Sequence, residues 1–414
     1  MVREKICNPL FLSVFICVLI IYLNAGHIPE KNGFTSIIPK EKVTKLSGYI
    51  SSSPARTSKG TFYSCQMKVF SSCDGNVESD CFGNIKVFVP SDYVEAFFPG
   101  KIFSGTGAET IIETGSYVEL EGRFSDDVFF GKKVLSCKLE PNRKNKVKIL
   151  RAKGRLKFKR MMYAWGPAGG FLLALLSGSR EYTEVSVAEN FKKAGLSHIL
   201  ALSGMHLSMF SGLAVFLGTK LRRKRITLVF QLVSVSAFVW FAGFSPSLLR
   251  AFICLFIVLF QGILSLEKSD MLTVLCFSFF TQCMISPNDL LNTGFILSYG
   301  ALCGILITGE FLRKIYSFCF PKFISSSLAS STGAQMITLP VSAKMFGMIT
   351  PVGIVSSVFV SPFVTLFIYS GLFFIVFGLL FPPVCCIGEF FMRIQYNLIS
   401  SMVGFFAKVP AFVF

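Results

Sequence analysis

Two of the three histidines in this chain stand close together in an otherwise apolar stretch, beside a serine. The stretch reads Gly195-Leu196-Ser197-His198-Ile199-Leu200-Ala201-Leu202-Ser203-Gly204-Met205-His206. In one continuous helix His198, Leu202 and His206 would share a face, because they are spaced four residues apart. Ionisable groups at membrane depth cost roughly 3 kcal/mol or more, so they usually mark a pathway or a site. This cluster is therefore the first candidate for chemistry.

Three interpretations of the cluster compete. A metal site would need a third ligand of matching spacing, and the sequence has none, so we predict no metal and no cofactor. Ser203 and His206 could act as nucleophile and base of an intramembrane hydrolase, although no third group that would orient the histidine is evident. The simplest interpretation is hydrogen bonding between helices, in a bundle or around a water-filled pore. We therefore expect a polar cluster in a protein that is not an enzyme.

Other polar residues interrupt the apolar segments. Arg250 follows Ser245-Pro246-Ser247, where it could bind phosphate along a path or extend to the membrane interface. Gln335 is a further polar point near the end of a segment. The candidate path residues are thus His198, Ser203, Gly204, His206, Arg250 and Gln335.

The elements that must position these residues are membrane segments. The mean hydropathy is +0.61 and only 15% of the 414 residues are charged, against about 25% in soluble domains. Apolar stretches recur at 162–177, 197–219, 226–244, 246–264, 271–286, 290–309, 324–341, 350–369, 370–381 and 383–406. Several are shorter than the ~20 residues of a straight crossing. We predict a polytopic α-helical membrane protein with about eight to ten membrane segments.

The chain divides into four predicted parts. Residues 1–26 hold a short apolar run that favours a membrane anchor, 40–142 a β domain, 143–160 a basic linker and 161–414 the transmembrane domain. The positive-inside rule places Leu221–Arg225, Lys268 and Arg313-Lys314 in the cytoplasm. The β domain then lies on the extracytoplasmic side, if the first apolar run crosses outward.

The β domain shows five candidate strands, at 43–51, 61–70, 84–90, 116–124 and 128–139, separated by turn-forming clusters. Val118 and Leu120 share one face of the fourth strand, and Tyr117 and Glu119 share the other. Five such strands favour a small Greek-key barrel of the OB type, although a small sandwich would give the same pattern. Four cysteines of an exported domain could form two disulfides, with the connectivity open. They are Cys65, Cys73, Cys81 and Cys137.

The run from Arg143 to Arg160 holds ten basic residues and no acidic one, within a chain of net charge +18. Such a run is a solvated linker, a surface for anionic lipid or a surface for nucleic acid. The candidate DNA-binding residues in it are Arg143, Lys144, Lys146, Lys148, Arg151 and Lys153.

The segment Ala194–Leu207 resembles the signature of the ComEC-type competence family, which has the form G-L-x-H-L-L-A-I-S-G-L-H. Later blocks follow in the family's order, at Gly243–Ala251, Ser286–Tyr299, Thr338–Pro340 and Phe346–Pro351. The resemblance covers roughly residues 40–370. It departs from the family at Ile296, where the family has Gln, and at Ser356, where it has Asn.

The resemblance implies a channel in the bacterial inner membrane that takes up single-stranded DNA during natural transformation, with an exported OB-like domain. OB barrels bind single strands on aromatic side chains along a basic groove, and Tyr49, Phe62, Tyr63 and Tyr117 are the candidates here. The 414 residues contain no H-x-H-x-D-H cluster and no G-x-x-x-x-G-K-[ST] motif. We therefore expect a separate nuclease as a partner, and either a cytoplasmic motor or the membrane gradient as the driving force. Membrane lipid surrounds the chain, and a homo-oligomer is possible. An alternative is a small-solute transporter.

Overall fold

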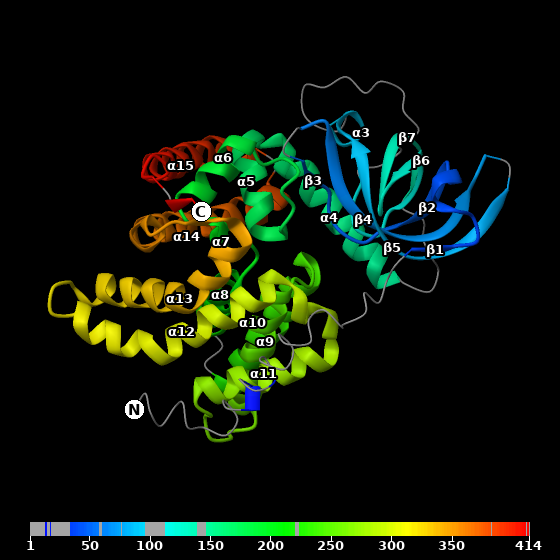
Figure 1. Cartoon of the computed structure of the whole chain (residues 1–414). Coiled ribbons are helices and arrows are strands. Elements are labelled where there is room, and N and C mark those ends of the chain that lie inside the picture. Colours follow the sequence, from blue (N-terminus) through cyan, green and yellow to red (C-terminus); the bar gives the residue numbers. More distant parts are fainter. Residues whose placement is uncertain are drawn as a thin grey trace.

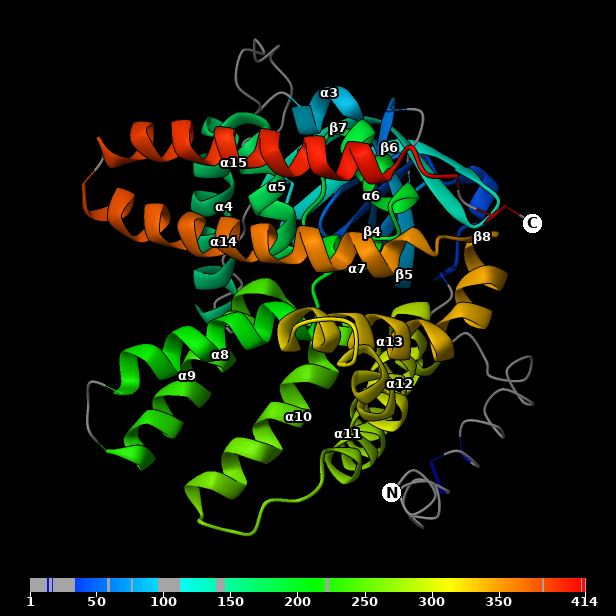
Figure 2. The same cartoon turned by 90° about the vertical axis from the view of Figure 1, so that its left-hand side faces the viewer.

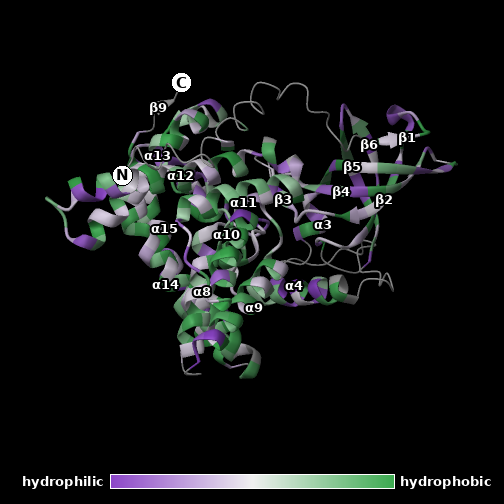
Figure 3. Cartoon of the chain, turned by 90° about the horizontal axis from the view of Figure 1, so that it is seen from below, coloured by the Kyte–Doolittle hydropathy of each residue, from purple (hydrophilic) through white to green (hydrophobic). Residues whose placement is uncertain are grey.

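The computed structural model describes residues 13, 14, 17, 34–57, 60–75, 77–95, 112–138, 146–219, 223–381, 383–410 and 412–413. The predicted anchor at 1–26 lies almost wholly outside these residues. The described chain forms a β domain and a helical part, with helix α4 between them (Figure 1). Figure 3 shows that the hydrophobic residues concentrate in the helical part.

The β domain contains the five predicted strands and two short additional ones. Its elements are β1 (Thr35–Ser36), η2 (Lys40–Lys42), β2 (Lys45–Ile50), β3 (Ala55–Arg56), β4 (Phe62–Cys73), β5 (Glu78–Pro90), α3 (Ser91–Glu95), β6 (Tyr117–Ser125) and β7 (Val128–Lys138). The strand order is β1-β5-β7-β6-β2-β4-β3, and β4 also pairs with β5. All pairings are antiparallel except β5 with β7, which is parallel.

Alternating side chains build the core of this domain. Val118 and Leu120 are fully buried, as the alternation in the sequence predicted, while Tyr117 and Glu119 are only half-buried. Two aromatic clusters lie outside the core on the other faces of the strands: Phe62 with Phe88 and Phe130, and Tyr49 with Phe70 and Tyr117. The prediction of two disulfides is wrong, because Cys65, Cys73 and Cys81 carry free thiols. Burial raises the pKa of the Cys65 thiol to about 12, so this cysteine is an inert core residue.

The helical part begins with α4 and ends near the last described residues. Its elements are α4 (Lys146–Ala164), α5 (Gly166–Ser177), α6 (Val185–Lys193), α7 (Ser197–Leu200), α8 (Gly204–Thr219), α9 (Lys224–Ala242), α10 (Pro246–Ile263), α11 (Met271–Ile285), η3 (Pro287–Leu291), α12 (Thr293–Tyr316), α13 (Lys322–Phe346), β8 (Met348–Ile349), α14 (Val352–Leu380), α15 (Val384–Phe406) and β9 (Phe412–Val413). Figure 2 shows α14 and α15 side by side.

Within the described residues, four helices are long and apolar enough to cross a membrane: α9, α10, α12 and α14. Three shorter apolar helices, α5, α8 and α11, accompany them. The chain is therefore a polytopic membrane protein, and the finer number of eight to ten segments stays a prediction. Two of the predicted segments, 350–369 and 370–381, are one helix, α14, which runs on through Pro362.

Four buried charges join the β domain to the helices. Glu113 precedes β6, Arg155 and Lys159 lie on α4, and Glu181 lies between α5 and α6. Arg155 Nε is 3.2 Å from Glu113 Oε1, and Lys159 Nζ pairs with Glu113 Oε2 and lies 2.7 Å from Glu181 Oε1. All four side chains are at most 3% exposed. Two cations face two carboxylates, so the cluster is neutral as a whole.

Hydrogen bonds complete this cluster. Arg155 also donates to the carbonyls of Phe241 and Ala242 at the end of α9, at 2.9 and 2.8 Å. Tyr163 donates to Glu181 Oε1 at 2.5 Å, and the buried Tyr63 of β4 donates to the Glu181 carbonyl at 3.2 Å. Arg155 of α4 thus bonds both Glu113 of the β domain and the end of the membrane helix α9.

The protonation of the cluster follows from its geometry. Burial raises the pKa of Glu113, but the Lys159 ammonium and the Arg155 guanidinium outweigh it and hold that pKa at about 2. Burial lowers the pKa of Lys159, and the two glutamates reverse this and raise it. Burial raises the pKa of Glu181, as does its neighbour Glu113. A carboxyl whose folded pKa is depressed stabilises the fold above its unfolded pKa near 4, and that contribution is lost as pH falls toward 2.

We predict that Glu113→Gln destabilises the protein by about 3–5 kcal/mol, because it leaves buried cations with one carboxylate in place of two. The free energy of unfolding of the purified protein would be measured in detergent by chemical denaturation. Asp127→Asn is the matched control: it breaks the Lys40–Asp127 pair of 2.6 Å at the surface and should change little. Equal stability of Glu113→Gln and the natural protein would contradict the assigned role of the cluster.

Candidate functional site

The signature stretch forms two helices with a break between them. Helix α7 ends at Leu200, Ala201 is extended, and α8 begins at Gly204. The prediction that His198, Leu202 and His206 share one helix face is therefore wrong, since His198 lies on α7 and His206 on α8. Broken helices within a membrane protein expose backbone polar groups that line cavities or bind ligands.

Ser203 and His206 cap the first turn of α8. The Ser203 backbone N–H donates to His206 Nδ1 at 3.3 Å, and Ser203 Oγ lies at the same distance from that nitrogen. The Leu207 N–H donates to the Ser203 carbonyl at 3.4 Å. His206 thus returns to the N-cap residue from the third helical position, as the last residue of a capping box does. Because Nδ1 accepts the Ser203 N–H, the neutral ring carries its proton on Nε2.

His206 is fully buried, and its Nε2 has no hydrogen-bond partner among the described residues. The helix cap therefore uses one ring nitrogen and leaves the other, a donor, without an acceptor. An unsatisfied buried donor costs about 1–3 kcal/mol. His206 Nε2 is one of two buried side-chain nitrogens near the start of α8 that have no partner among the described residues.

Arg250 of α10 supplies the second atom. The side chain is 9% exposed, and its Nε has no partner within the described ranges. A Cβ placed on Gly204 would lie 3.5 Å from Arg250 Nη2, so the guanidinium reaches the start of α8. Ser247 of the same helix donates to the Leu202 carbonyl at 2.7 Å, which fixes α10 against the break. The guanidinium thus faces Gly204 at the start of α8 and does not extend to the membrane interface.

A tyrosine held by amide and hydroxyl groups supports Arg250. The Arg250 guanidinium lies 5.9 Å from the centre of the Tyr299 ring. Tyr299 donates to Gln282 Oε1 at 3.1 Å and contacts Ser278 Oγ at 3.2 Å. Gln282 in turn donates to the Pro246 carbonyl at 3.0 Å and to Asp289 at 3.2 Å. The quadrupole of the ring favours a cation over its face, but the tyrosine supplies no counter-charge.

A close backbone contact holds the other end of the signature. Gly195 has a φ of +73°, and a Cβ there would meet Gly353 Cα at 2.7 Å. Ser356 of α14 donates to the Ala194 carbonyl at 2.8 Å. Gln335 also lies here, because its Nε2 would be 3.1 Å from a Cβ on Gly353. Ser356, which departs from the family pattern, therefore keeps a contact with the signature.

Five of the six candidate path residues divide into two groups, and the sixth, His198, lies on α7. Ser203, Gly204, His206 and Arg250 meet at the start of α8, whereas Gln335 lies at the Gly195–Gly353 contact. The sequence missed Tyr299, Gln282 and Ser278. Tyr299 could have been found, since it ends the block at 286–299, but no spacing signalled the other two. Within the described ranges no group of three or more His, Cys, Asp or Glu residues could hold a metal ion.

The basic run from 143 to 160 is mostly helix α4. Of the candidate DNA-binding residues, Arg143 and Lys144 lie outside the described residues, and the side chains of Lys146 and Lys148 are not described. Lys153 is exposed. Arg151 Nε donates to the Phe241 carbonyl at 3.5 Å. DNA binding by this run stays a prediction, and its Arg155 and Lys159 are used within the fold.

More than half of the chain matches a known protein family. The family model described as "Competence protein" matches residues 175–414. ComE operon protein 3 of Bacillus subtilis is 25% identical over 49% of this chain and 25% of its own length. Recombination protein 2 of Haemophilus influenzae is 28% identical over 33% of this chain and 18% of its own length. An uncharacterized protein of Aquifex aeolicus is 27% identical over 78% of this chain and 74% of its own length. No solved structure matches.

We predict that Gly195→Ala weakens the contact between Gly195 and α14. The alanine would have to adopt a positive φ, and its methyl group would overlap Gly353. The thermal unfolding temperature of the purified protein should fall by several degrees. Gly404→Ala is the control, since nothing lies within 4 Å of a Cβ there and the residue is helical. An unchanged unfolding temperature in Gly195→Ala would show that the contact with α14 is not tight.

Proposed function

Because this chain belongs to the competence protein family, we propose that it is the inner-membrane channel through which single-stranded DNA enters the cytoplasm during transformation. The observation that carries the proposal is the buried Arg250 beside the start of α8 at Gly204. The matched segments cover about a quarter and a fifth of the curated competence relatives, so function rests on the geometry of this chain.

The unpartnered donors at the start of α8 support an anionic passenger. Arg250 is permanently charged and 91% buried, and its Nε has no hydrogen-bond partner among the described residues. None of the ion pairs between described residues includes Arg250. A buried charge without a partner is strongly destabilising. His206 Nε2 is a second donor without an acceptor. A phosphate oxygen of a DNA strand accepts from both kinds of donor, and each nucleotide brings one.

The same donors argue against the alternative functions. The capping geometry accounts for the Ser203–His206 contact of 3.3 Å, because the Ser203 N–H occupies the ring nitrogen that a base would use. The proposal therefore assigns no catalytic role to Ser203. A neutral solute would leave the Arg250 charge uncompensated, so a small-solute transporter would have to carry anions.

Within this proposal the β domain is an OB-type module on the extracytoplasmic side. Its pairings run from β2 through β4, β5, β7 and β6 and back to β2, with β5 and β7 parallel. On three of these strands Phe62, Phe88 and Phe130 form a half-buried cluster, with 4.7 Å between the Phe88 and Phe130 ring centres. Lys86 Nζ lies 5.3 Å from the Phe88 ring.

This cluster suits single-stranded DNA because bases stack on aromatic faces and a lysine attracts the backbone. Of the stacking candidates from the sequence, Phe62 belongs to it, and Tyr49 and Tyr117 form a second half-buried cluster with Phe70. Tyr63 is fully buried and bonded to Glu181, so it belongs to the core. A nuclease, a motor and further copies of the chain complete the proposed partners.

We predict that Arg250→Met abolishes most DNA uptake without unfolding the protein. Loss of a charge-assisted hydrogen bond to phosphate should slow entry about tenfold or more. Removal of an unpaired buried charge should leave the protein as stable as before, or more stable. The measurement is entry of labelled DNA into the cytoplasm, with the membrane level and unfolding temperature of each variant recorded.

Arg313→Met is the matched control, because Arg313 is exposed on α12 and pairs with Glu310 at the surface. It should leave uptake unchanged. If DNA enters cells that lack the whole gene as well as it enters cells with the natural protein, the protein is not the route. If the deletion abolishes uptake but Arg250→Met takes up DNA as well as the natural protein does, the route does not use this arginine.

We further predict that Phe88→Ala weakens binding of a single-stranded oligonucleotide to the full-length protein by about tenfold, since one stacked base is worth about 1–3 kcal/mol. Fluorescence anisotropy in detergent would measure the affinity. Phe82→Ala is the control on the same strand, because Phe82 is 67% exposed and outside the cluster. Equal losses in both variants would exclude a specific role for the cluster.

A further inference from the structure

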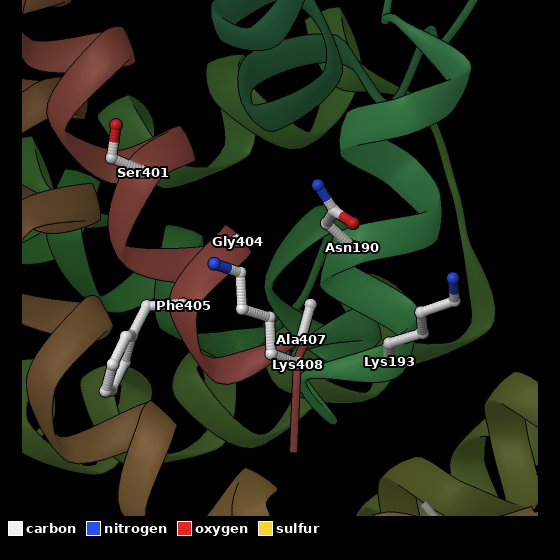
Figure 4. A pocket seen from close by; sticks show the side chains of 7 residues that line it. All are labelled: Asn190, Lys193, Ser401, Gly404, Phe405, Ala407 and Lys408. Carbon is white, nitrogen blue, oxygen red and sulfur yellow. The ribbon is translucent and has the colours of Figure 1, made fainter. Parts of the chain in front are cut away.

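A polar hollow lies between α6 and the end of α15. It is lined by Asn190, Lys193, Ser401, Gly404, Phe405, Ala407 and Lys408, and has a volume of about 540 Å³. In Figure 4, Lys408 and Asn190 reach into the space between the two helices, and the Lys193 stem lies below Asn190 on α6. None of the described residues that line this hollow carries a carboxylate.

The two lysines of the hollow have no counter-charge among the described residues. In the described part of the chain, neither the Lys193 nor the Lys408 ammonium makes a hydrogen bond or an ion pair. Both side chains are exposed, so their flexible stems let either ammonium turn into the space between the helices. Two cations and one amide around a single hollow form a site for an anion such as a phosphate group.

An apolar hollow of about 600 Å³ adjoins the polar one. It is lined by Phe359, Ser401, Met402, Phe405 and Phe406, so the two hollows share Ser401 and Phe405. The Phe359 ring of α14 stacks with Phe406, with 6.2 Å between the ring centres. Phe359 and Phe405 are 54% and 68% exposed. These rings therefore present an open apolar groove directly beside the cationic site.

The change from apolar to charged side chains at the end of α15 is the one expected at the edge of a bilayer. Phe359 lies within the membrane-crossing part of α14, and Phe405 and Phe406 form the last turn of α15. Lys408 follows just beyond the helix end. Lysines at such ends place their ammonium groups at the level of lipid headgroups while their stems remain on apolar surface.

We propose that this pair of hollows binds one anionic phospholipid, with its phosphate between Lys193 and Lys408 and an acyl chain along Phe359, Phe405 and Phe406. A nucleic acid would use the lysines but not the apolar groove, and a neutral lipid would use the groove but not the lysines. Only an anionic lipid satisfies both. Lys193 immediately precedes Ala194 and Gly195, so the lipid lies beside the N-terminal end of the signature stretch.

The test uses the full-length protein in phosphatidylcholine bilayers that contain a photoreactive analogue of phosphatidylglycerol. After illumination, the labelled peptides are identified by mass spectrometry. The label should fall on α6 and on the end of α15. The double variant Lys193→Ala/Lys408→Ala should reduce that label about tenfold, because each lysine contributes to attraction of an anionic headgroup.

A second variant tests shape with charge unchanged. Gly404→Leu should fill the hollow without strain, because nothing lies within 4 Å of a Cβ there, and should reduce the label similarly. Lys268→Ala/Lys314→Ala removes the same charge from an exposed loop and from the exposed last turn of α12, and should leave the label unchanged. Unfolding temperatures of all variants should equal that of the natural protein.

Three outcomes would overturn the proposal. A phosphatidylcholine analogue that labels the same peptides equally would show nonspecific boundary lipid. Displacement of the label by inorganic phosphate or by a single-stranded oligonucleotide would assign the lysines to those anions. Undiminished labelling of Lys193→Ala/Lys408→Ala and Gly404→Leu would show that the lipid binds elsewhere.

Discussion

The position of the β domain depends on one neutral set of buried charges. Glu113, Arg155, Lys159 and Glu181 have almost no access to water, and none of them could stay charged there without the other three. Arg155 also bonds carbonyls at the end of α9, so the sheet, α4 and a membrane helix share one set of contacts. The aromatic face of the sheet is thereby held at a fixed place relative to the helices.

The broken signature is held by the same need to satisfy polar groups. Where the helix stops between α7 and α8, freed backbone groups must find partners, because lipid offers none. The Leu202 carbonyl accepts from Ser247 of α10 and the Ala194 carbonyl from Ser356 of α14. Helices far apart in sequence therefore meet at this stretch, and Arg250 arrives with Ser247 on the same turn of α10.

Local patterns predicted the elements and missed what joins them. The five long strands and the positions of α9, α10 and α11 follow from periodicity and turn residues, which are local properties. The break after Leu200 was missed because Ala201 and Leu202 are apolar and carry no Gly or Pro to signal a helix end. The partners of Glu113 lie more than 40 residues away, and a single sequence does not show such pairings.

Two sets of buried cations in this chain have opposite meanings. The basic run at 143–160 drew attention by its density, yet Arg155 and Lys159 within it are fully paired and serve the fold. Arg250 stands alone in an apolar segment, and in the described structure it has a tyrosine ring beside it but no anion. Protein stability explains the first set and does not explain the second, because an unpaired buried charge costs free energy that folding alone never recovers. A ligand that brings negative charge to Arg250 would account for its presence.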